Sequence, residues 1–174
     1  MIKRSFIVFI TLLLLLSCAV CATACGNKAD PAEDNGDKTE IGTYTVKYQG
    51  TVIELGKDAT GVLTALGEPS AKQFVASCGE GAGDQWRYTY ASIYLFTVKT
   101  DEGEIVDAVA LRDDIAKTGK GITVGSTEAE ITAAYGEPTA KQGNKLRYTK
   151  DNHTMEFVLD DADMVKLVEI RVEG

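Results

Sequence analysis

The sequence predicts an α+β protein with two tandem repeats, each a short helix plus a three-stranded antiparallel sheet. Two observations predict this fold class. The stretch 66–73 returns at 135–142 with its Gly-Glu-Pro and Ala-Lys-Gln residues unchanged, and recurrence of this kind indicates a repeat architecture. Residues with strand-like patterns then follow each copy in the same order.

Each copy of the repeated stretch is expected to end a short helix. Asp58 has the place of an N-cap for the first helix, and Thr127 with Glu130 has the spacing of a capping box for the second. Gly67 and Gly136 are expected to end the two helices, each with a proline two residues further on. Such short helices are marginal alone, so each needs a sheet to pack against.

Three strands are expected after each helix, and the motif Arg-Tyr-Thr aligns the two sets. It occurs at 87–89 and again at 147–149, which places Trp86 opposite Leu146 and Tyr90 opposite Lys150 in the alignment. A hairpin around Gln49-Gly50 precedes the first repeat. The expected strands are 86–90, 93–98 and 105–111 in the first repeat, and 146–150, 154–159 and 165–172 in the second.

The first residues are typical of an exported lipoprotein. Residues 6–16 form an apolar run that is too short to span a membrane but suits the core of a signal peptide. Small residues at 22–24 precede Cys25, which is the expected lipid attachment site. Cys18 is the weaker alternative because leucine stands where a small residue is usual, and Cys21 follows Val20. An ordinary secretory signal or an uncleaved anchor is the remaining alternative.

These features predict the domain organisation. No large apolar residue occurs in the acidic stretch 26–40, so it is interpreted as a flexible linker rather than a calcium loop. The expected parts are a signal peptide at 1–24, a lipidated N-terminus and linker at 25–40, a first repeat with its leading hairpin at 41–115, and a second repeat at 116–174.

Composition argues against several functions. The formal net charge is −8, so nucleic acid is not an expected partner, and membrane attachment is expected through the N-terminal lipid. His153 is the single histidine, in an expected hairpin turn, and therefore no His-based zinc site or Cys-His pair is predicted. The glycines at 79–83 lack the Lys-Ser/Thr of a phosphate loop. We expect no catalytic residue, metal or cofactor.

Candidate binding residues are concentrated in the first repeat. Nine extra residues between Gln73 and Arg87 include Cys78, which has no intrachain partner if the cysteines of the leader are removed and Cys25 is acylated. Cys78 is interpreted either as a buried or unreactive thiol or as part of a contact loop or intermolecular disulfide.

Aromatic strand residues supply the other candidates. Trp86, Tyr88 and Tyr90 share one side of a strand, and Tyr94 lies on the next strand, which is apolar or aromatic on both sides. One side of the sheet must cover the helices. The other is predicted to be either a buried junction between the repeats or an exposed aromatic binding face.

The pattern Gly125-Ser126-Thr127, short helix, Gly136-Glu137-Pro138 and closing strands resembles the SmpA/OmlA (BamE-like) repeat of small outer-membrane-assembly lipoproteins. Two such repeats in tandem are similar to the beta-lactamase inhibitor protein (BLIP-like) fold. The resemblance covers residues 52–172. It implies a helix-plus-sheet fold and a binding or scaffolding role, with no catalytic residues.

The sequence therefore predicts a lipoprotein tethered to the extracytoplasmic face of the cell membrane that binds an unknown envelope or extracellular protein. A purely structural envelope lipoprotein is the alternative, followed by a hydrolase with an unrecognised site.

Overall fold

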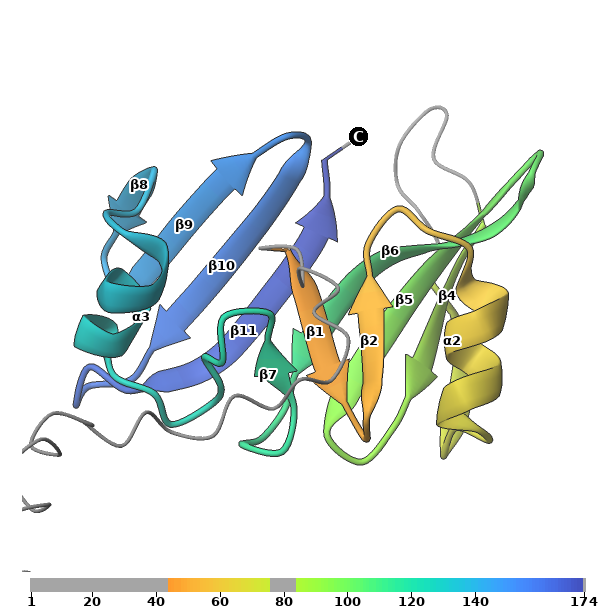
Figure 1. The fold of residues 1–174 in the computed structure, drawn as a ribbon, viewed down its shortest axis with the longest axis horizontal. Helices are drawn as coiled ribbons and strands as arrows, with labels where there is room; N and C mark the ends of the chain where they lie inside the picture. Colours follow the sequence, from red (N-terminus) through yellow and green to blue (C-terminus); the bar gives the residue numbers. More distant parts are fainter. Residues whose placement is uncertain (1–43, 76–83, 174) are drawn as a thin grey trace, which may run out of the picture. The chain divides into compact units, whose positions relative to one another are not determined.

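The computed structural model describes residues 44–75 and 84–173, all within one compact unit, Thr39–Gly174. This part of the chain has a mostly-β α+β fold with two short helices, an eight-stranded antiparallel sheet and a three-stranded antiparallel sheet (Figure 1). The predicted α+β class is confirmed. No helix among the described residues is long and apolar enough to cross a membrane.

The small sheet has the order β2-β1-β7, and the large sheet has the order β3-β4-β5-β6-β11-β10-β9-β8. The elements are, along the chain, β1 (Thr45–Tyr48), β2 (Thr51–Glu54), α2 (Ala59–Leu66), β3 (Ala71–Val75), β4 (Gln85–Thr89), β5 (Ile93–Thr100), β6 (Gly103–Leu111), β7 (Lys117–Thr118), α3 (Glu128–Tyr135), β8 (Ala140–Gln142), β9 (Lys145–Lys150), β10 (His153–Leu159) and β11 (Val165–Val172).

The prediction of three strands per repeat was wrong, because each repeat contributes four strands to the large sheet. The additional strands, β3 and β8, contain the repeated Ala-Lys-Gln, which was not among the expected strands. They pair with β4 and β9 at the two edges of the sheet. Both are largely exposed, so they carry no alternation of buried and exposed residues that could reveal a strand in the sequence.

Both predicted helix starts and both helix ends are confirmed. The Asp58 carboxylate accepts a hydrogen bond from the Thr60 amide at 3.0 Å. Thr127 and Glu130 form the capping box, each side chain accepting from the other residue's backbone amide. Gly67 follows α2 at φ 69° and ψ −156°, and Gly136 follows α3 at φ 80° and ψ −160°, a backbone region that is essentially restricted to glycine.

The sheet register corrects the alignment of the two repeats by two residues. Ala71 pairs with Thr89, whereas the equivalent Ala140 pairs with Arg147. Tyr90 donates its hydroxyl hydrogen bond to the Gly67 carbonyl, and Tyr148 makes the same bond to Gly136, at 3.2 and 3.0 Å. Tyr90 is therefore the structural equivalent of Tyr148, and the matching Arg-Tyr-Thr triplets are not equivalent in space.

On the next strand the predicted alignment was wrong by one residue. The pairs Ile93–Leu111 and Met155–Ile170 occupy the same place in the two repeats, so Ile93 matches Met155 and not Thr154. A shift of one residue exchanges the two faces of a strand. Consequently Tyr94 is equivalent to Glu156.

The two repeats join through β6 and β11, which pair edge to edge inside the large sheet. Val109 pairs with Ile170, and Leu111 pairs with Val168. Val109 and Val168 are equivalent positions, as are Leu111 and Ile170, so the junction has approximate two-fold symmetry. Because the junction is a strand pair within one sheet, it leaves the second side of that sheet uncovered by the other repeat.

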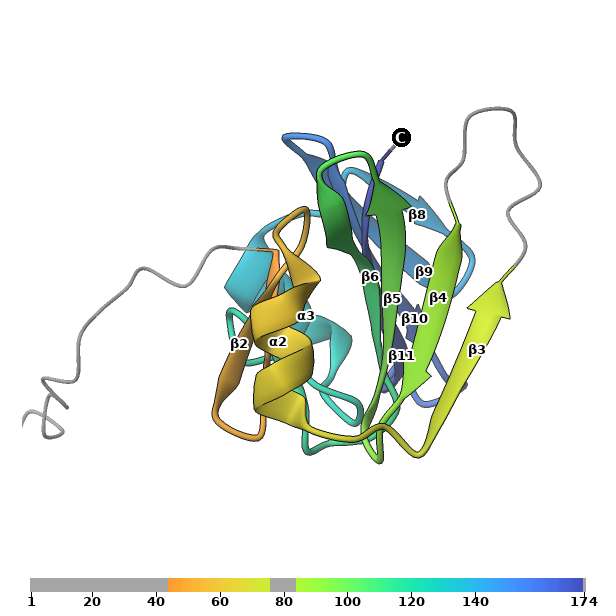
Figure 2. The same ribbon diagram turned by 90° about the vertical axis from the view of Figure 1, so that its right-hand side faces the viewer.

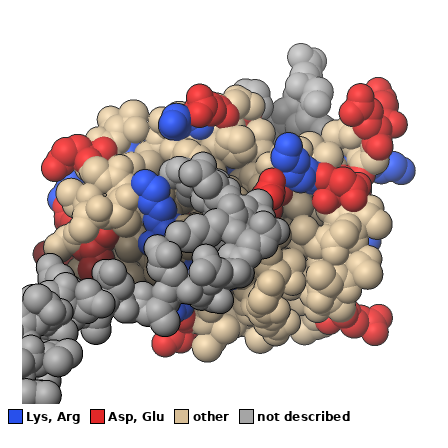
Figure 3. Space-filling view, viewed as in Figure 1, with Lys and Arg blue, Asp and Glu red and all other residues tan. Residues whose placement is uncertain are grey.

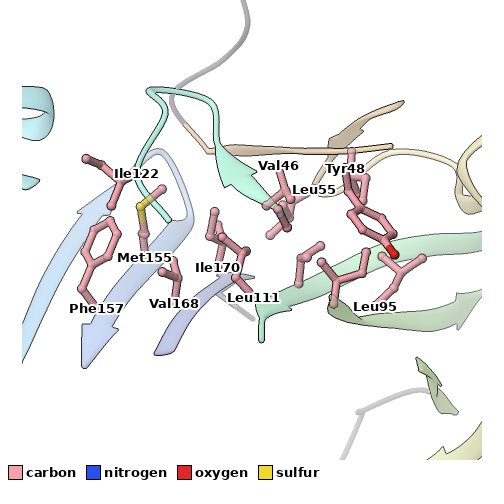
Figure 4. Close-up of a cluster of buried hydrophobic side chains, with 14 of the residues drawn as sticks. Val46, Tyr48, Leu55, Leu95, Leu111, Ile122, Met155, Phe157, Val168 and Ile170 are labelled. Atoms are coloured by element: carbon pink, nitrogen blue, oxygen red, sulfur yellow. The ribbon is translucent and has the colours of Figure 1, made fainter. Parts of the chain in front are cut away.

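The helices and the small sheet lie on one side of the large sheet (Figure 2). A hydrophobic core fills the space between them, and Figure 4 shows Val46 and Leu55 from the small sheet side above Leu111, Met155, Phe157, Val168 and Ile170. Strand β7, which lies between the last strand of the first repeat and α3, pairs with β1. The small sheet therefore combines strands from both sides of the repeat boundary.

Candidate functional site

The site residues predicted from sequence are distributed over two different faces of the large sheet. Tyr88 and Tyr90 are each only 5% exposed and belong to the core on the helix side. Trp86, on the same side of β4, is partly buried and packed against that core. Tyr94 points to the opposite side and is partly exposed. Cys25 and Cys78 lie outside the described residues.

Tyr88 and Tyr90 therefore do not form an accessible aromatic strip with Trp86. The Tyr88 hydroxyl donates to the Glu104 carboxylate at 2.7 Å, which also accepts a hydrogen bond from Thr97. Burial raises the pKa of the Tyr88 phenol; the Glu104 charge adds to this increase and Lys72 opposes it. These are the contacts of a polar group satisfied inside the fold.

Trp86 keeps a small accessible patch at the edge of the sheet. Its ring contacts Phe74 edge-on at a centroid distance of 5.5 Å, and the Lys72 ammonium lies 4.7 Å from its centroid. Phe74 is 53% exposed. Of the three candidate residues on the helix side, Trp86 is the one that is only partly buried.

The side of the large sheet away from the helices carries the more distinctive arrangement, and we call it the open face. In its first-repeat half, Tyr94 and Phe96 on β5 lie beside Arg87 on β4, with Phe96 paired directly with Arg87. Arg112 follows the last residue of β6. We call Arg87, Tyr94, Phe96 and Arg112 the Tyr94 cluster.

Two guanidinium groups lie close to the Tyr94 ring. The Arg112 and Arg87 guanidinium carbons lie 4.6 and 5.2 Å from the Tyr94 ring centroid, within the range of a cation–π interaction. Arg112 also donates to the carbonyls of Tyr90 and Ala91 at 3.1 and 3.3 Å. Arg87 donates to the Gln73 side chain. The surrounding strands thus fix both arginines in place.

Neither arginine of the Tyr94 cluster has a carboxylate partner among the described residues. The Arg87 Nε–H is, in addition, a buried donor for which no described residue supplies an acceptor. Unpaired donors of this kind call for an explanation in a folded protein.

The second repeat provides an internal comparison. Glu156 takes the place of Tyr94 and forms ion pairs with Lys145 and Arg147 at 2.9 and 3.1 Å. Burial raises the pKa of the Glu156 carboxyl, but its bonds to the two cations outweigh burial and hold the pKa below its usual value. The cations are thus neutralised within the second repeat, whereas in the first repeat no carboxylate of the described residues pairs with them.

A shallow hollow of about 270 Å³ adjoins the Tyr94 cluster on the open face. Gln85 donates to the Asp107 carboxylate at 2.7 Å inside it. Burial raises the pKa of Asp107, against the effects of the Gln85 hydrogen bond and the Arg171 charge. The lining residues are Gln85, Phe96, Asp107, Ala108, Glu169, Arg171 and Val172.

A second hollow, of about 290 Å³, lies beside the small sheet. Tyr44 stacks on His153 there at a centroid distance of 5.6 Å, and His153 Nδ1 lies 2.8 Å from the Asp151 carbonyl oxygen. Within the described ranges, no group of His, Cys, Asp and Glu side chains has the arrangement of a metal site. The contacts of His153 pair it with a ring and a carbonyl rather than with a nucleophile.

The helix-side face shows a mixed charge distribution. Acidic and basic side chains are interspersed there among other residues, without a large patch of one sign in the visible described part (Figure 3). Lys72 and Lys120 also lie over aromatic rings, but among the described residues the Tyr94 ring alone is approached by two arginines.

Sequence reasoning found Tyr94 but missed its partners. Arg112 follows the last strand expected in the first repeat, 105–111, and Arg87 was placed only by its strand. Alternation along each strand could have put Tyr94 and Phe96 on one face. The sequence alone held no signal for the register that brings Arg87 and Arg112 onto the same ring.

Comparison with known proteins adds a structural similarity. No protein-family model matches the chain, and none of the curated protein sequences matches it. The chain is structurally similar to a DUF4309 family protein (YjgB) from Bacillus subtilis, with 15% identity over 72% of this chain and 84% of that chain, at a TM-score of 0.38. The resemblance to the SmpA/OmlA repeat has no support from a family model.

Proposed function

We propose that this chain is an extracytoplasmic, lipid-anchored module that binds a protein partner through the open face of its large sheet. The Tyr94 cluster is the observation that supports this function. Tyrosine and arginine are enriched at the energetically dominant positions of interfaces. The strands hold both residue types in place before binding, which lowers the entropy cost of association.

The anchor is part of the proposal and depends on the small residues before Cys25. The proposal also includes the resemblance of the tandem repeats to the SmpA/OmlA-like and BLIP-like folds. This resemblance depends on the Gly-helix-Gly-x-Pro pattern. Cys25→Ser should abolish fatty-acid (palmitate) labelling and shift the protein out of the membrane fraction. Unchanged labelling would show that another cysteine, such as Cys18, carries the lipid.

Site-specific photo-crosslinking in intact cells tests the contact surface. A photoreactive residue at Thr89, which pairs with Tyr94 on the open face, should give one dominant protein adduct. The matched control is Thr64, which is exposed on α2 and should give none. The adduct should disappear when Phe96→Ala and Tyr94→Ala are combined with the probe at Thr89.

The captured protein must then bind the purified full chain directly. Equal adducts from Thr89 and Thr64, or an adduct that survives the double substitution, would exclude the open face as the contact surface. Absence of any adduct from the open face would favour the purely structural envelope lipoprotein. Activity in a hydrolase screen would favour an enzyme instead.

A further inference from the structure

We propose that the Tyr94 cluster recognises an acidic peptide segment of the partner protein, with Arg87 and Arg112 binding its carboxylates next to the Tyr94 ring. This inference rests on the proposed function and specifies the chemistry of the partner. It follows from charge, from geometry and from the comparison between the two repeats.

Charge is the first argument. The chain as a whole carries a formal charge of −8, yet Arg87 and Arg112 lie on the open face without a carboxylate partner in the described part of the chain. Elsewhere on this face, cations form ion pairs with carboxylates: Lys145 and Arg147 pair with Glu156, and Arg171 pairs with Glu169.

Geometry is the second argument. A cation–π contact with the Tyr94 ring satisfies none of the N–H groups along the edge of a guanidinium. That edge matches a carboxylate, with which arginine forms paired hydrogen bonds. The acceptors that the two arginines already contact, Gln73 and the carbonyls of Tyr90 and Ala91, are all neutral. The Arg87 Nε–H also lacks an acceptor among the described residues, but it is buried and is therefore not itself a contact for the partner.

The second repeat shows what satisfies such a pair of cations in this sheet. At the position equivalent to Tyr94, Glu156 places a carboxylate between Lys145 and Arg147. Of these two cations only Lys145 has an equivalent in the first repeat, which is Arg87; Arg112 approaches the ring from the end of β6, and the first repeat has a ring in place of the carboxylate. A glutamate or aspartate from a partner would supply the missing anion, while Phe96 would contact an apolar neighbour in the peptide.

The experiment uses the purified full chain in neutral detergent micelles and a fluorescein-labelled peptide of alternating glutamate and serine. Fluorescence anisotropy should show binding that weakens as NaCl is raised. A lysine–serine peptide of the same length should not bind. Arg87→Gln combined with Arg112→Gln should weaken binding by about tenfold or more, because charge-assisted hydrogen bonds are lost.

The matched control is Lys145→Gln combined with Arg147→Gln in the second repeat. This control also removes two positive charges from the open face, but the cations that carry them already have Glu156 as a partner. Affinity for the glutamate peptide should change less than about twofold, the small effect that long-range screened charges produce. Thermal unfolding of each variant checks that the fold is retained.

Three results would overturn the inference: equal weakening in the two double variants, unchanged binding in the arginine variant, or absence of peptide binding. Binding to vesicles with anionic phospholipid, lost in the arginine variant and without peptide binding, would assign the cluster to a lipid surface instead. The proposed function fails separately, if the Thr89 crosslink to a partner protein is absent. If a protein crosslinks at Thr89 but binds the arginine variant with unchanged affinity, the proposed function stands. Recognition of an acidic segment by the two arginines would then be excluded.

Discussion

Two phenylalanines show that the side of the sheet on which a residue lies decides whether its side chain is part of the core. Phe157 is fully buried at the centre of the second repeat and contacts the Tyr148 ring edge-on at 5.8 Å. Phe96 is the equivalent of Val158 on the open face and is only partly buried. A phenylalanine is thus part of the core at position 157 in the second repeat, whereas Phe96 in the first repeat is a candidate contact residue.

Asp107 gives a prediction for the pH dependence of stability. Its carboxyl pKa is raised by burial above the ordinary value of 3.8, so the ionised form destabilises the folded state. That cost is present above the folded-state pKa and is lost as the pH falls through it. Asp107→Asn should therefore raise the melting temperature at pH 7, and the difference from the parent should shrink towards pH 4.

The hydrogen bond from Gln85 can be kept in this variant, because an asparagine carbonyl also accepts it. Melting curves at several pH values measure the effect. A variant that is less stable than the parent at pH 7 would show that the charge of Asp107 is stabilising in the fold.

At the scale of single elements, both helices end in the same way, with a glycine of positive φ directly after the last helical residue. Gly67 and Gly136 have φ of 69° and 80° with ψ near the extended range, where a Cβ atom is strained. A Cβ at either position would meet no atom within 4 Å. The requirement for glycine at these helix ends is therefore conformational and not steric crowding by neighbours.

Gly67→Ala and Gly136→Ala should each destabilise the fold by more than about 1 kcal/mol. Urea unfolding gives the free energy of each variant. Gly61→Ala is the matched control, since Gly61 lies inside α2 without a positive φ and with open space around its Cα. Alanine there should be neutral or stabilising. Equal effects at all three glycines would contradict the conformational explanation.

At the scale of the whole molecule, the shared sheet predicts that the two repeats unfold together. Residues of both repeats form one hydrophobic core, and β6 and β11 join them by backbone pairing. Strand β7 adds a further link by pairing with β1 in the small sheet. Separate unfolding of one repeat would expose both the junction strand and part of the core.

Trp86 makes this prediction measurable, because the single tryptophan of the chain reports on the first repeat. Phe157→Ala in the second repeat should cost about 3–5 kcal/mol and should lower the urea midpoint seen by Trp86 fluorescence as much as that seen by far-UV circular dichroism. Phe96→Ala, on the open face, should cost about 1 kcal/mol or less. Different midpoints for the two probes would show that the repeats unfold independently.

The sequence by itself determined the local features of this protein. The helix caps at Asp58 and Thr127, the glycines that end the helices and the hairpin turn at Gln49-Gly50 all appear where the pattern placed them. These features depend on hydrogen bonds and backbone preferences within a few residues. They can therefore be read without knowing the fold.

Only the tertiary structure decided which residues share a face. The edge strands β3 and β8 have no buried stripe, and the Arg-Tyr-Thr motif suggested an alignment that the hydrogen-bond register shifts by two residues. Register joins strands that are distant in the sequence, and a shift of one residue moves a side chain to the opposite side of the sheet. For this reason Tyr88 and Tyr90 lie in the core, while Arg87 and Arg112 meet at Tyr94 on the open face.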